Sequence, residues 1–209
     1  ILTEAPIHNG LIKTSEKRIF ALEMLNRVGL DSESLDRYPH QFSGGQRQRI
    51  GIARALAVSP ELLVCDESIA ALDVSIQAQV LNLFVKLKQD YDLTYLFISH
   101  DIGVIEHISD RVIVMYLGRI VETAPIEEFI DNPNHPYTKA LLEGVPRLEI
   151  GMRNYEPVSG EIPSPLDPPS GCHFHPRCKY AREECQAVKP DLVEISPNHY
   201  SACHLNVSK

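Results

Sequence analysis

The sequence predicts an α/β fold with a parallel sheet and a small cysteine-containing appendage. Two short apolar runs, 61–65 and 94–98, flank an amphipathic segment of helical period, 75–89. Strand, helix and strand at this spacing are typical of a parallel βαβ unit. From Pro125 onward the composition changes, because 12 of the 15 prolines and four of the five cysteines lie in the remainder.

Two helices are predicted before this βαβ unit. Residues 16–28 have helical period, with Ser15 as a candidate N-cap and Gly29 as a stop. A second helix is predicted from about residue 44 to residue 58, with Ser43 as its N-cap. The apolar positions of the first helix are Ile19, Leu22, Leu25 and Val28.

The sequence also predicts how one strand is buried, where a hairpin forms and where the domain boundary lies. Within the run 61–65, the four residues after Glu61 are continuously apolar, as in a strand buried on both faces. Residues 111–116 and 119–122 are predicted to form a hairpin around Leu117 and Gly118, although Leu-Gly is a weaker turn signal than Asn-Gly. The five prolines between Pro157 and Pro169 mark the predicted domain boundary.

Length and charge limit the classes of protein. The 209 residues are 44% hydrophobic and 23% charged, enough for one ordinary core plus an appendage. The net charge of −8 does not favour a nucleic-acid binder. No apolar run approaches the ~18 residues that span a bilayer, and the first residues show no basic and apolar leader.

Glycines at a predicted helix start give the first chemical signal. Ser43, Gly44 and Gly45, followed by Gln46, leave free N–H groups at the positive end of a helix dipole. An anionic phosphate oxygen would fit there. Taken alone, the same residues are better explained by a plain serine N-cap with glycines in the turn before the helix.

Polar residues at strand ends give the second signal. Asp66 and Glu67 follow one predicted strand, and His100 follows the next. Ligands of parallel α/β sheets gather at the carboxyl ends of the strands. One carboxylate could hold Mg²⁺ while the other polarises a water molecule, with His100 near a γ-phosphate. A solvated acidic turn and an exposed histidine are the structural alternatives.

In their order, these elements resemble the nucleotide-binding subunits of ABC transporters. Residues 42–46 look like the ABC signature, 62–67 like Walker B with its catalytic Glu67, 70–73 like the D-loop, and His100 like the switch histidine. The fold expected from the resemblance is a partial ABC-type nucleotide-binding domain, with a parallel sheet core and a helical subdomain.

Three further segments narrow the resemblance to oligopeptide and dipeptide importers. These segments are Asp36–His40, Asp73–Gln79 and Asn134–Thr138. The resemblance implies an ATPase with ATP and Mg²⁺ that acts in a head-to-tail dimer with a second ABC ATPase subunit. It further implies two transmembrane permease subunits, a solute-binding protein as an indirect partner, no nucleic acid, and a peripheral location at the cytoplasmic face of the cell membrane.

The resemblance also assigns roles to residues. Ser43, Gly44, Gly45 and Gln46 would contact the ATP held by the partner. Asp66 would hold Mg²⁺, Glu67 would orient water for in-line attack, and His100 would assist it. Asp73 would belong to the ATP site through the D-loop. Importers of nickel or other solutes remain open alternatives to peptide importers.

Two positions depart from the family pattern. Ser68 stands where the family usually has Pro after the catalytic Glu, and Ala70 stands where the D-loop usually begins with Ser. Ser68 frees backbone that a proline would restrict. Neither change removes a carboxylate, but both affect the region where hydrolysis and dimer contact are expected to be coupled.

The appendage carries a cysteine cluster formed by Cys172, Cys178, Cys185 and Cys203. Disulfides are disfavoured in a cytosolic ATPase. The four thiols match the ligand count of a [4Fe–4S] cluster, with which the similar segment of the peptide importers is associated. Zinc is the second choice, with His173, His175 or His204 as substitute ligands. Unliganded cysteines are the third.

The phosphate-binding motif Gly-x4-Gly-Lys-[Ser/Thr] is absent from the 209 residues. Either the chain is the later part of an importer ATPase, or it is a non-catalytic partner that supplies only the signature in trans. The DNA upstream discriminates between them. The expected regions are 1–60 (helical subdomain and signature helix), 61–130 (Walker B, D-loop and switch histidine), 131–169 (family-specific region and linker) and 170–209 (cysteine appendage).

Overall fold

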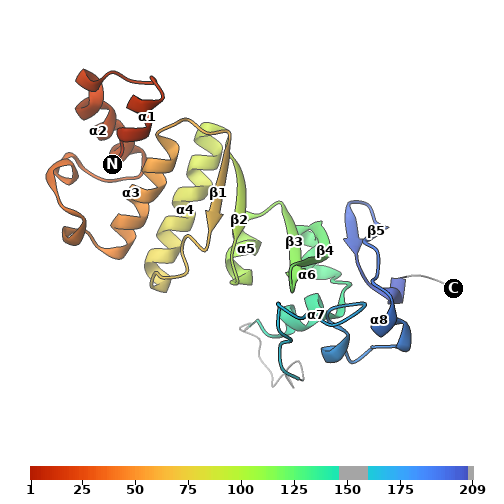
Figure 1. Cartoon of the computed structure of the whole chain (residues 1–209). Helices are drawn as coiled ribbons and strands as arrows, with labels where there is room; N and C mark the ends of the chain where they lie inside the picture. Colours follow the sequence, from red (N-terminus) through yellow and green to blue (C-terminus); the bar gives the residue numbers. More distant parts are fainter. Residues whose placement is uncertain (146–159, 207–209) are drawn as a thin grey trace. The chain divides into compact units, whose positions relative to one another are not determined.

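The computed structural model describes residues 1–145 and 160–206, which form two compact units, 1–108 and 109–209 (Figure 1). The predicted boundary stretch, from Pro157 to Pro169, begins outside the described residues. The four expected regions stay a prediction.

The first unit contains the predicted βαβ arrangement. Strand β1 pairs in parallel with β2, in a register that runs from Leu62 opposite Thr94 to Asp66 opposite Ile98. The elements of this unit are α1 (Glu4–His8), η1 (Thr14–Glu16), α2 (Lys17–Arg27), η2 (Ser32–Asp36), η3 (Pro39–Gln41), α3 (Gly44–Leu56), β1 (Leu62–Asp66), α4 (Val74–Tyr91), β2 (Thr94–Ile98) and α5 (Ile102–Ile108).

The core of this unit covers one face of the two strands. Leu63 and Cys65 of β1 are buried in the same cluster as Phe84 of α4. The Phe84 ring meets the rings of Tyr95 and Phe97 edge-on, with centroids 5.6 Å and 5.5 Å apart. Edge-on aromatic pairs add to the free energy that burial supplies.

The prediction that β1 is buried on both faces is wrong for the described residues. Burial alternates along the strand, so that side chains next to each other in the sequence differ in exposure. The reason is that the core packs on the face of Leu63 and Cys65 only. The exposed apolar side chains of the two strands are Leu62, Val64, Leu96 and Ile98.

The predicted first helix differs at its start. Ser15 lies in the 3₁₀ turn η1, and α2 begins at Lys17 with no side-chain cap. Ile19 is 68% exposed, because the buried face of α2 runs through Met24, Leu25 and Val28 instead. The stop at Gly29 is confirmed, since α2 ends at Arg27, Val28 is its C-cap, and Gly29 follows with a φ of 71°.

The second unit is built on an antiparallel sheet with strand order β3-β4-β6-β5. The predicted hairpin is confirmed, with Leu117 and Gly118 both at positive φ in its turn. The elements are β3 (Arg111–Tyr116), β4 (Arg119–Pro125), α6 (Ile126–Asp131), α7 (Pro136–Glu143), η4 (His175–Arg177), α8 (Glu183–Ala187), β5 (Val193–Ser196), β6 (His199–Ser201) and η5 (His204–Asn206).

The cysteine appendage shares this sheet. Strand β6 pairs with β4, with Glu122 opposite Ser201 and Thr123 opposite Tyr200. Residues far apart in the sequence therefore form one sheet, which places the cysteine segment against the hairpin.

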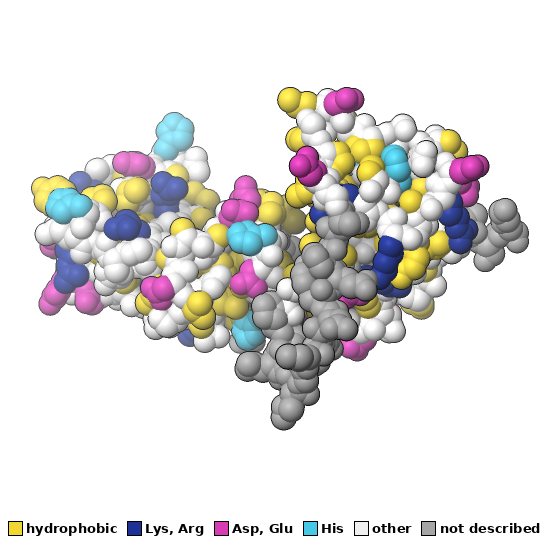
Figure 2. Space-filling view, turned by 90° about the horizontal axis from the view of Figure 1, so that it is seen from below, with side chains coloured by type: hydrophobic (Ala, Val, Ile, Leu, Met, Phe, Trp, Pro, Cys, Tyr) yellow, Lys and Arg dark blue, Asp and Glu magenta, His cyan; other side chains and the backbone are white. Residues whose placement is uncertain are grey.

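The surface of the molecule mixes the types of side chain. On the face drawn in Figure 2, acidic, basic and hydrophobic side chains are interspersed. Within the described ranges, none of the helices is both long and apolar enough to cross a bilayer.

Candidate functional site

Ser43 caps helix α3, as the sequence predicts. Its Oγ accepts a hydrogen bond from the backbone N–H of Gln46 at 3.3 Å. The side chain of Gln46 in turn accepts the N–H of Ser43, at 3.0 Å. This reciprocal capping box fixes the loop before the helix. Ser43 and Gly44 are exposed at the helix start, whereas Gly45 is buried.

A close approach of two helices explains why residue 45 is glycine. A Cβ on Gly45 would lie 2.4 Å from Cγ2 of Ile76, which no real contact allows. A Cβ on Gly44 would lie at an ordinary 3.6 Å from Leu72. The start of α3 thus packs against residues on either side of Asp73.

Asp73 is the N-cap of helix α4. Its Oδ1 accepts the N–H of Ile76 at 3.0 Å and the hydroxyl of Ser75 at 2.9 Å. The hydrogen bond from Ile76, followed by that from Ser75, lowers the pKa of the Asp73 carboxyl. The ionised side chain therefore stabilises the turn that joins the predicted D-loop to α4.

Two predicted catalytic residues lie together at the carboxyl end of the parallel strands. Glu67 follows β1 and His100 follows β2, and Oε1 of Glu67 is 3.3 Å from Nδ1 of His100. The backbone N–H of Glu67 donates to the carbonyl of Ile98 at 3.0 Å, which ties the two strand ends together. Both side chains are largely exposed, at 59% and 74%. Asp66 is the last residue of β1.

The backbone at Glu67 has an unusual conformation. Its φ is 44°, in the left-handed region, and its carbonyl accepts the N–H of Ala70 at 3.2 Å. A residue before proline is restricted to extended conformations. Ser68, in place of the usual proline, is therefore compatible with the observed turn.

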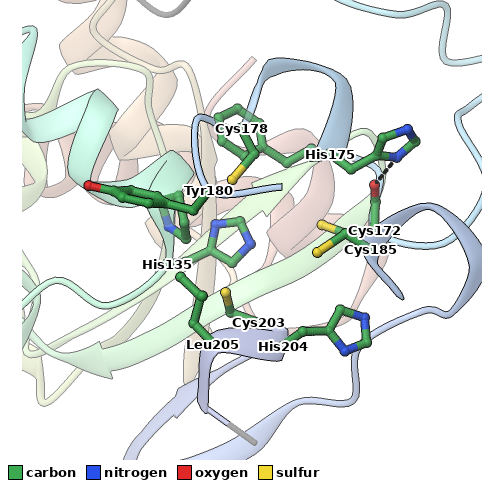
Figure 3. A pocket seen from close by; sticks show the side chains of 11 residues that line it. His135, Cys172, His175, Cys178, Tyr180, Cys185, Cys203, His204 and Leu205 are labelled. Atoms are coloured by element: carbon green, nitrogen blue, oxygen red, sulfur yellow. Dashed lines mark hydrogen bonds between the residues drawn. The ribbon is translucent and has the colours of Figure 1, made fainter. Parts of the chain in front are cut away.

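The four predicted cysteines surround one hollow in the second unit (Figure 3). The hollow is small, with a cavity volume of about 20 Å³, and it is partly open to solvent. Its side chains come from segments that are distant in the sequence. They include Cys172, Cys178, Cys185 and Cys203, together with His135, His175 and His204.

A glycine permits the cysteine segments to approach each other. Gly171 has a φ of 64°, and a Cβ there would lie 2.4 Å from the carbonyl oxygen of Cys185. The backbone N–H of Cys172 donates to that carbonyl at 2.8 Å. Gly171 therefore allows two walls of the hollow to meet through their backbones.

The hairpin turn holds the same segment from the other side. Arg119 donates to the carbonyl of Gly171 at 3.1 Å, and Nδ1 of His173 lies 3.2 Å from the carbonyl of Leu117. These contacts position Cys172, which follows Gly171 in the sequence.

Burial affects the thiols themselves. It raises the pKa of Cys172, Cys178 and Cys203 above the ordinary value, with smaller opposing contributions from backbone hydrogen bonds. Without a cation these three thiols are protonated at neutral pH. A metal that binds them must displace protons, as metal binding to thiolates generally does.

The predicted substitute ligands do not converge on one ion. His173 does not line the hollow, and Nε2 of His204 is 2.9 Å from the carbonyl of Val188. In residues 1–145 and 160–206, no group of three His, Cys, Asp or Glu side chains could hold a single metal ion.

A buried carboxylate, which the sequence analysis missed, joins the segments of the second unit. Glu122 accepts the backbone N–H groups of Asn134 and His135, each at 2.8 Å. Its Oε1 also lies 2.7 Å from Nε2 of His199. A charged residue at an inward position of a predicted strand was the signal that could have indicated this role.

His135 was noted in the sequence only as part of a motif. It is 1% exposed and caps helix α7, because its Nδ1 accepts the N–H of Tyr137 at 3.1 Å. Burial lowers its pKa to about 4, against a smaller opposing effect of Glu122. Pro136 at the first helical position was the available signal for a helix start.

Comparison with known proteins gives family matches to two parts of the chain. The family model described as ABC transporter matches residues 3–70. The model described as oligopeptide/dipeptide transporter, C-terminal region, matches residues 121–185. The chain is also similar to a solved ATP-binding cassette of an ABC transporter in its ADP conformation. That likeness has a TM-score of 0.52 at 27% identity, over 61% of this chain and 50% of the other. The class is therefore that of the ABC cassettes.

The curated relatives are more specific. The chain is 50% identical over 97% of its length to the dipeptide transport ATP-binding protein DppF of Haemophilus influenzae. It is 55% identical over 88% of its length to the oligopeptide transport ATP-binding protein AppF of Bacillus subtilis. The chain belongs to the family of ATP-binding proteins of oligopeptide and dipeptide ABC transporters. It spans 62% and 56% of the lengths of these two relatives.

Proposed function

We propose that the chain is part of an ATP-hydrolysing subunit that energises an ABC importer for oligopeptides or dipeptides. The supporting observation is the contact between Glu67 and His100 at the ends of two parallel strands, 3.3 Å apart. Proteins that hydrolyse nucleotides at such a sheet edge need a group that orients water and a second group near the γ-phosphate.

Each predicted residue has a role in this proposal. Glu67 orients the attacking water, His100 holds Glu67 and the phosphate end of the site, and Asp66 holds Mg²⁺. The capped start of α3, with Ser43, Gly44, Gly45 and Gln46, contacts the ATP of a second subunit. Asp73 caps α4 in the turn that packs beside the start of α3, and it thereby keeps the starts of these two helices in fixed positions. Mg²⁺ neutralises phosphate charge when it is bound.

The proposed assembly contains a second ATPase subunit, arranged head to tail, and two transmembrane permease subunits. A solute-binding protein delivers the substrate. The chain would lie at the cytoplasmic face of the membrane through its permease contacts. Its relatives are named for dipeptide and oligopeptide transport, which supports peptides as the solute.

The test begins with the DNA upstream of the codon for Ile1. An in-frame Gly-x4-Gly-Lys-[Ser/Thr] is expected there. The complete subunit, reconstituted with its permeases in liposomes, should hydrolyse ATP in the presence of peptide. Glu67→Gln should lower turnover at least about 100-fold and retain ATP binding. Glu61→Gln, before the opposite end of β1, is the matched control. Equal turnover of the wild type and the Glu67 variant would refute the assignment.

A [4Fe–4S] cluster at the four cysteines is the second part of the proposal. In such a cluster each thiolate binds a different iron, so the sulfurs surround a space rather than converge on a point. Four cysteines from distant segments line one hollow, and their number matches the ligand count of such a cluster, which supports the cluster over zinc. When bound, the cluster would crosslink the cysteine segments and supply a one-electron couple.

Metal analysis tests this part separately. Anaerobically purified chain should contain about four irons and four sulfides, which follows from the cluster type. The Cys178→Ser variant should lose most of the iron. Cys65→Ser, in the first unit, is the control and should keep it. Stoichiometric zinc without iron would overturn the cluster.

A further inference from the structure

The imidazole of His135 belongs to the wall of the cysteine-lined hollow. It lines the hollow with all four cysteines, although it lies on a different segment, at the start of α7. Figure 3 shows the ring reaching into the space around which the four sulfur atoms are arranged.

The position of His135 is fixed at three points. Its backbone N–H donates to Oε2 of the buried Glu122 at 2.8 Å. Its Nδ1 accepts the N–H of Tyr137 at 3.1 Å. The ring also packs against Phe174, with centroids 5.9 Å apart. A side chain held at its backbone, its ring nitrogen and its ring face presents its remaining nitrogen in one direction.

The hydrogen bond at Nδ1 of His135 determines whether the other ring nitrogen, Nε2, carries a proton. Because Nδ1 accepts an N–H, it carries no proton, and in the neutral ring the proton resides on Nε2. Nε2 is therefore a hydrogen-bond donor and not a free lone pair for a metal.

The other two histidines of the hollow differ in this respect. Nδ1 of His175 lies 3.0 Å from the carbonyl of Cys172, which requires a proton on Nδ1 and leaves Nε2 without one. Nε2 of His204 donates to the carbonyl of Val188 at 2.9 Å. Of these three rings, His135 is thus the one with an N–H available to the space among the cysteines.

We infer that His135 donates its Nε2–H to a sulfur atom of the iron–sulfur cluster and thereby raises the reduction potential of the cluster. The inference rests on the cluster proposed above. Reduction adds negative charge to the cluster and its sulfurs, and a hydrogen-bond donor stabilises the more negative state. His135 is a positioning and tuning residue, since the four thiolates alone hold the irons.

Two variants separate this role from the structural role of the same side chain. The amide oxygen of His135→Asn can replace Nδ1 as the cap of α7, but it places no donor at the position of Nε2. The amide nitrogen of His135→Gln can reach the position of Nε2, but the cap is lost. The first variant removes the donor and keeps the helix start, and the second does the opposite.

The experiment is a redox titration of the anaerobically purified 209-residue chain, followed by electron paramagnetic resonance of the reduced cluster. At a fixed solution potential, His135→Asn should lower the ratio of reduced to oxidised cluster about tenfold, a shift of about 59 mV for a one-electron couple. His135→Gln should stay close to the wild type in potential and unfold at a lower temperature.

The outcomes are distinguishable. If the wild type carries a cluster and His135→Asn has the wild-type potential, the inference is overturned and the cluster stands. If both variants shift the potential equally, the effect comes from packing and the inference is again overturned. If the wild type contains no iron and sulfide, the proposed cluster fails and the inference fails with it.

Discussion

Glu122 and His199 form a contact inside the second unit, with Oε1 and Nε2 2.7 Å apart and with side chains that are 0% and 2% exposed. These residues lie on strands β4 and β6, so the contact joins the hairpin to the cysteine appendage. The same carboxylate accepts the N–H groups before α7.

Glu122→Gln should destabilise the second unit by about 2–4 kcal/mol, because a buried acceptor of three hydrogen bonds loses its charge and half of its accepting capacity. Urea unfolding measures the effect. Glu128→Gln is the control, since Glu128 is 3.8 Å from the other nitrogen of His199 and 41% exposed. That variant should cost no more than ~1 kcal/mol. Equal losses in the two variants would contradict the special role of Glu122.

Gly45→Ala should destabilise the first unit by about 1–3 kcal/mol, because the added methyl group would lie 2.4 Å from Ile76. The matched control is Gly51→Ala in the same helix, where a Cβ meets nothing within 4 Å. That change should stabilise by about 0.5–1 kcal/mol, since alanine favours a helix interior. The temperature of thermal unfolding should fall in Gly45→Ala and rise in Gly51→Ala. An unchanged unfolding temperature of Gly45→Ala would refute the close approach of the two helices.

Ser68→Pro should change the conformation of Glu67. A proline at 68 disfavours the positive φ of 44° at Glu67, because it restricts the preceding residue to extended backbone. The contact of Glu67 with His100 should then be lost or altered. The NMR chemical shifts of the His100 ring would report the change. Ser68→Ala is the control and should leave them in place; unchanged shifts in both variants would contradict the prediction.

Asp73 should make the stability of the first unit depend on acidic pH. Its pKa is lowered in the folded state, mainly by the hydrogen bond from Ile76. Its contribution is therefore complete above the unfolded pKa of ~3.9 and is lost as pH falls through the folded value. Asp73→Asn keeps the cap without titration. Between pH 6 and pH 2.5, the midpoint of urea unfolding should fall more steeply for the wild type than for Asp73→Asn. Equal dependence of the two midpoints on pH would contradict the role of the carboxylate.

The 209-residue chain should bind MgATP only weakly, because its sequence has no Gly-x4-Gly-Lys-[Ser/Thr] to hold the β- and γ-phosphates. Isothermal calorimetry should detect no binding at micromolar concentrations. A subunit that carries the motif serves as the positive control. Micromolar affinity of the chain as given would refute the prediction.

Local signals in the sequence were sufficient for much of the first unit. Ser43 could be recognised as a cap because its partners are three residues away, and the βαβ unit followed from the period of apolar residues. The contact between Glu67 and His100 could be expected, since parallel strands end at one edge. The burial of β1 on only one face could not be predicted, because an apolar run does not show whether one or both faces of the strand are covered.

The amino-acid order by itself predicted the α/β class, the βαβ unit, the hairpin and the resemblance to peptide-importer ATPases, and it proposed which residues handle ATP. The tertiary structure alone decided that Glu122, His135 and His199 meet, and that the cysteines surround one hollow. The physical reason is separation along the chain. Helix caps and the periodic spacing of apolar residues involve residues that are close in sequence. Strands β4 and β6, by contrast, pair across about 80 residues of sequence, through contacts that depend on tertiary packing.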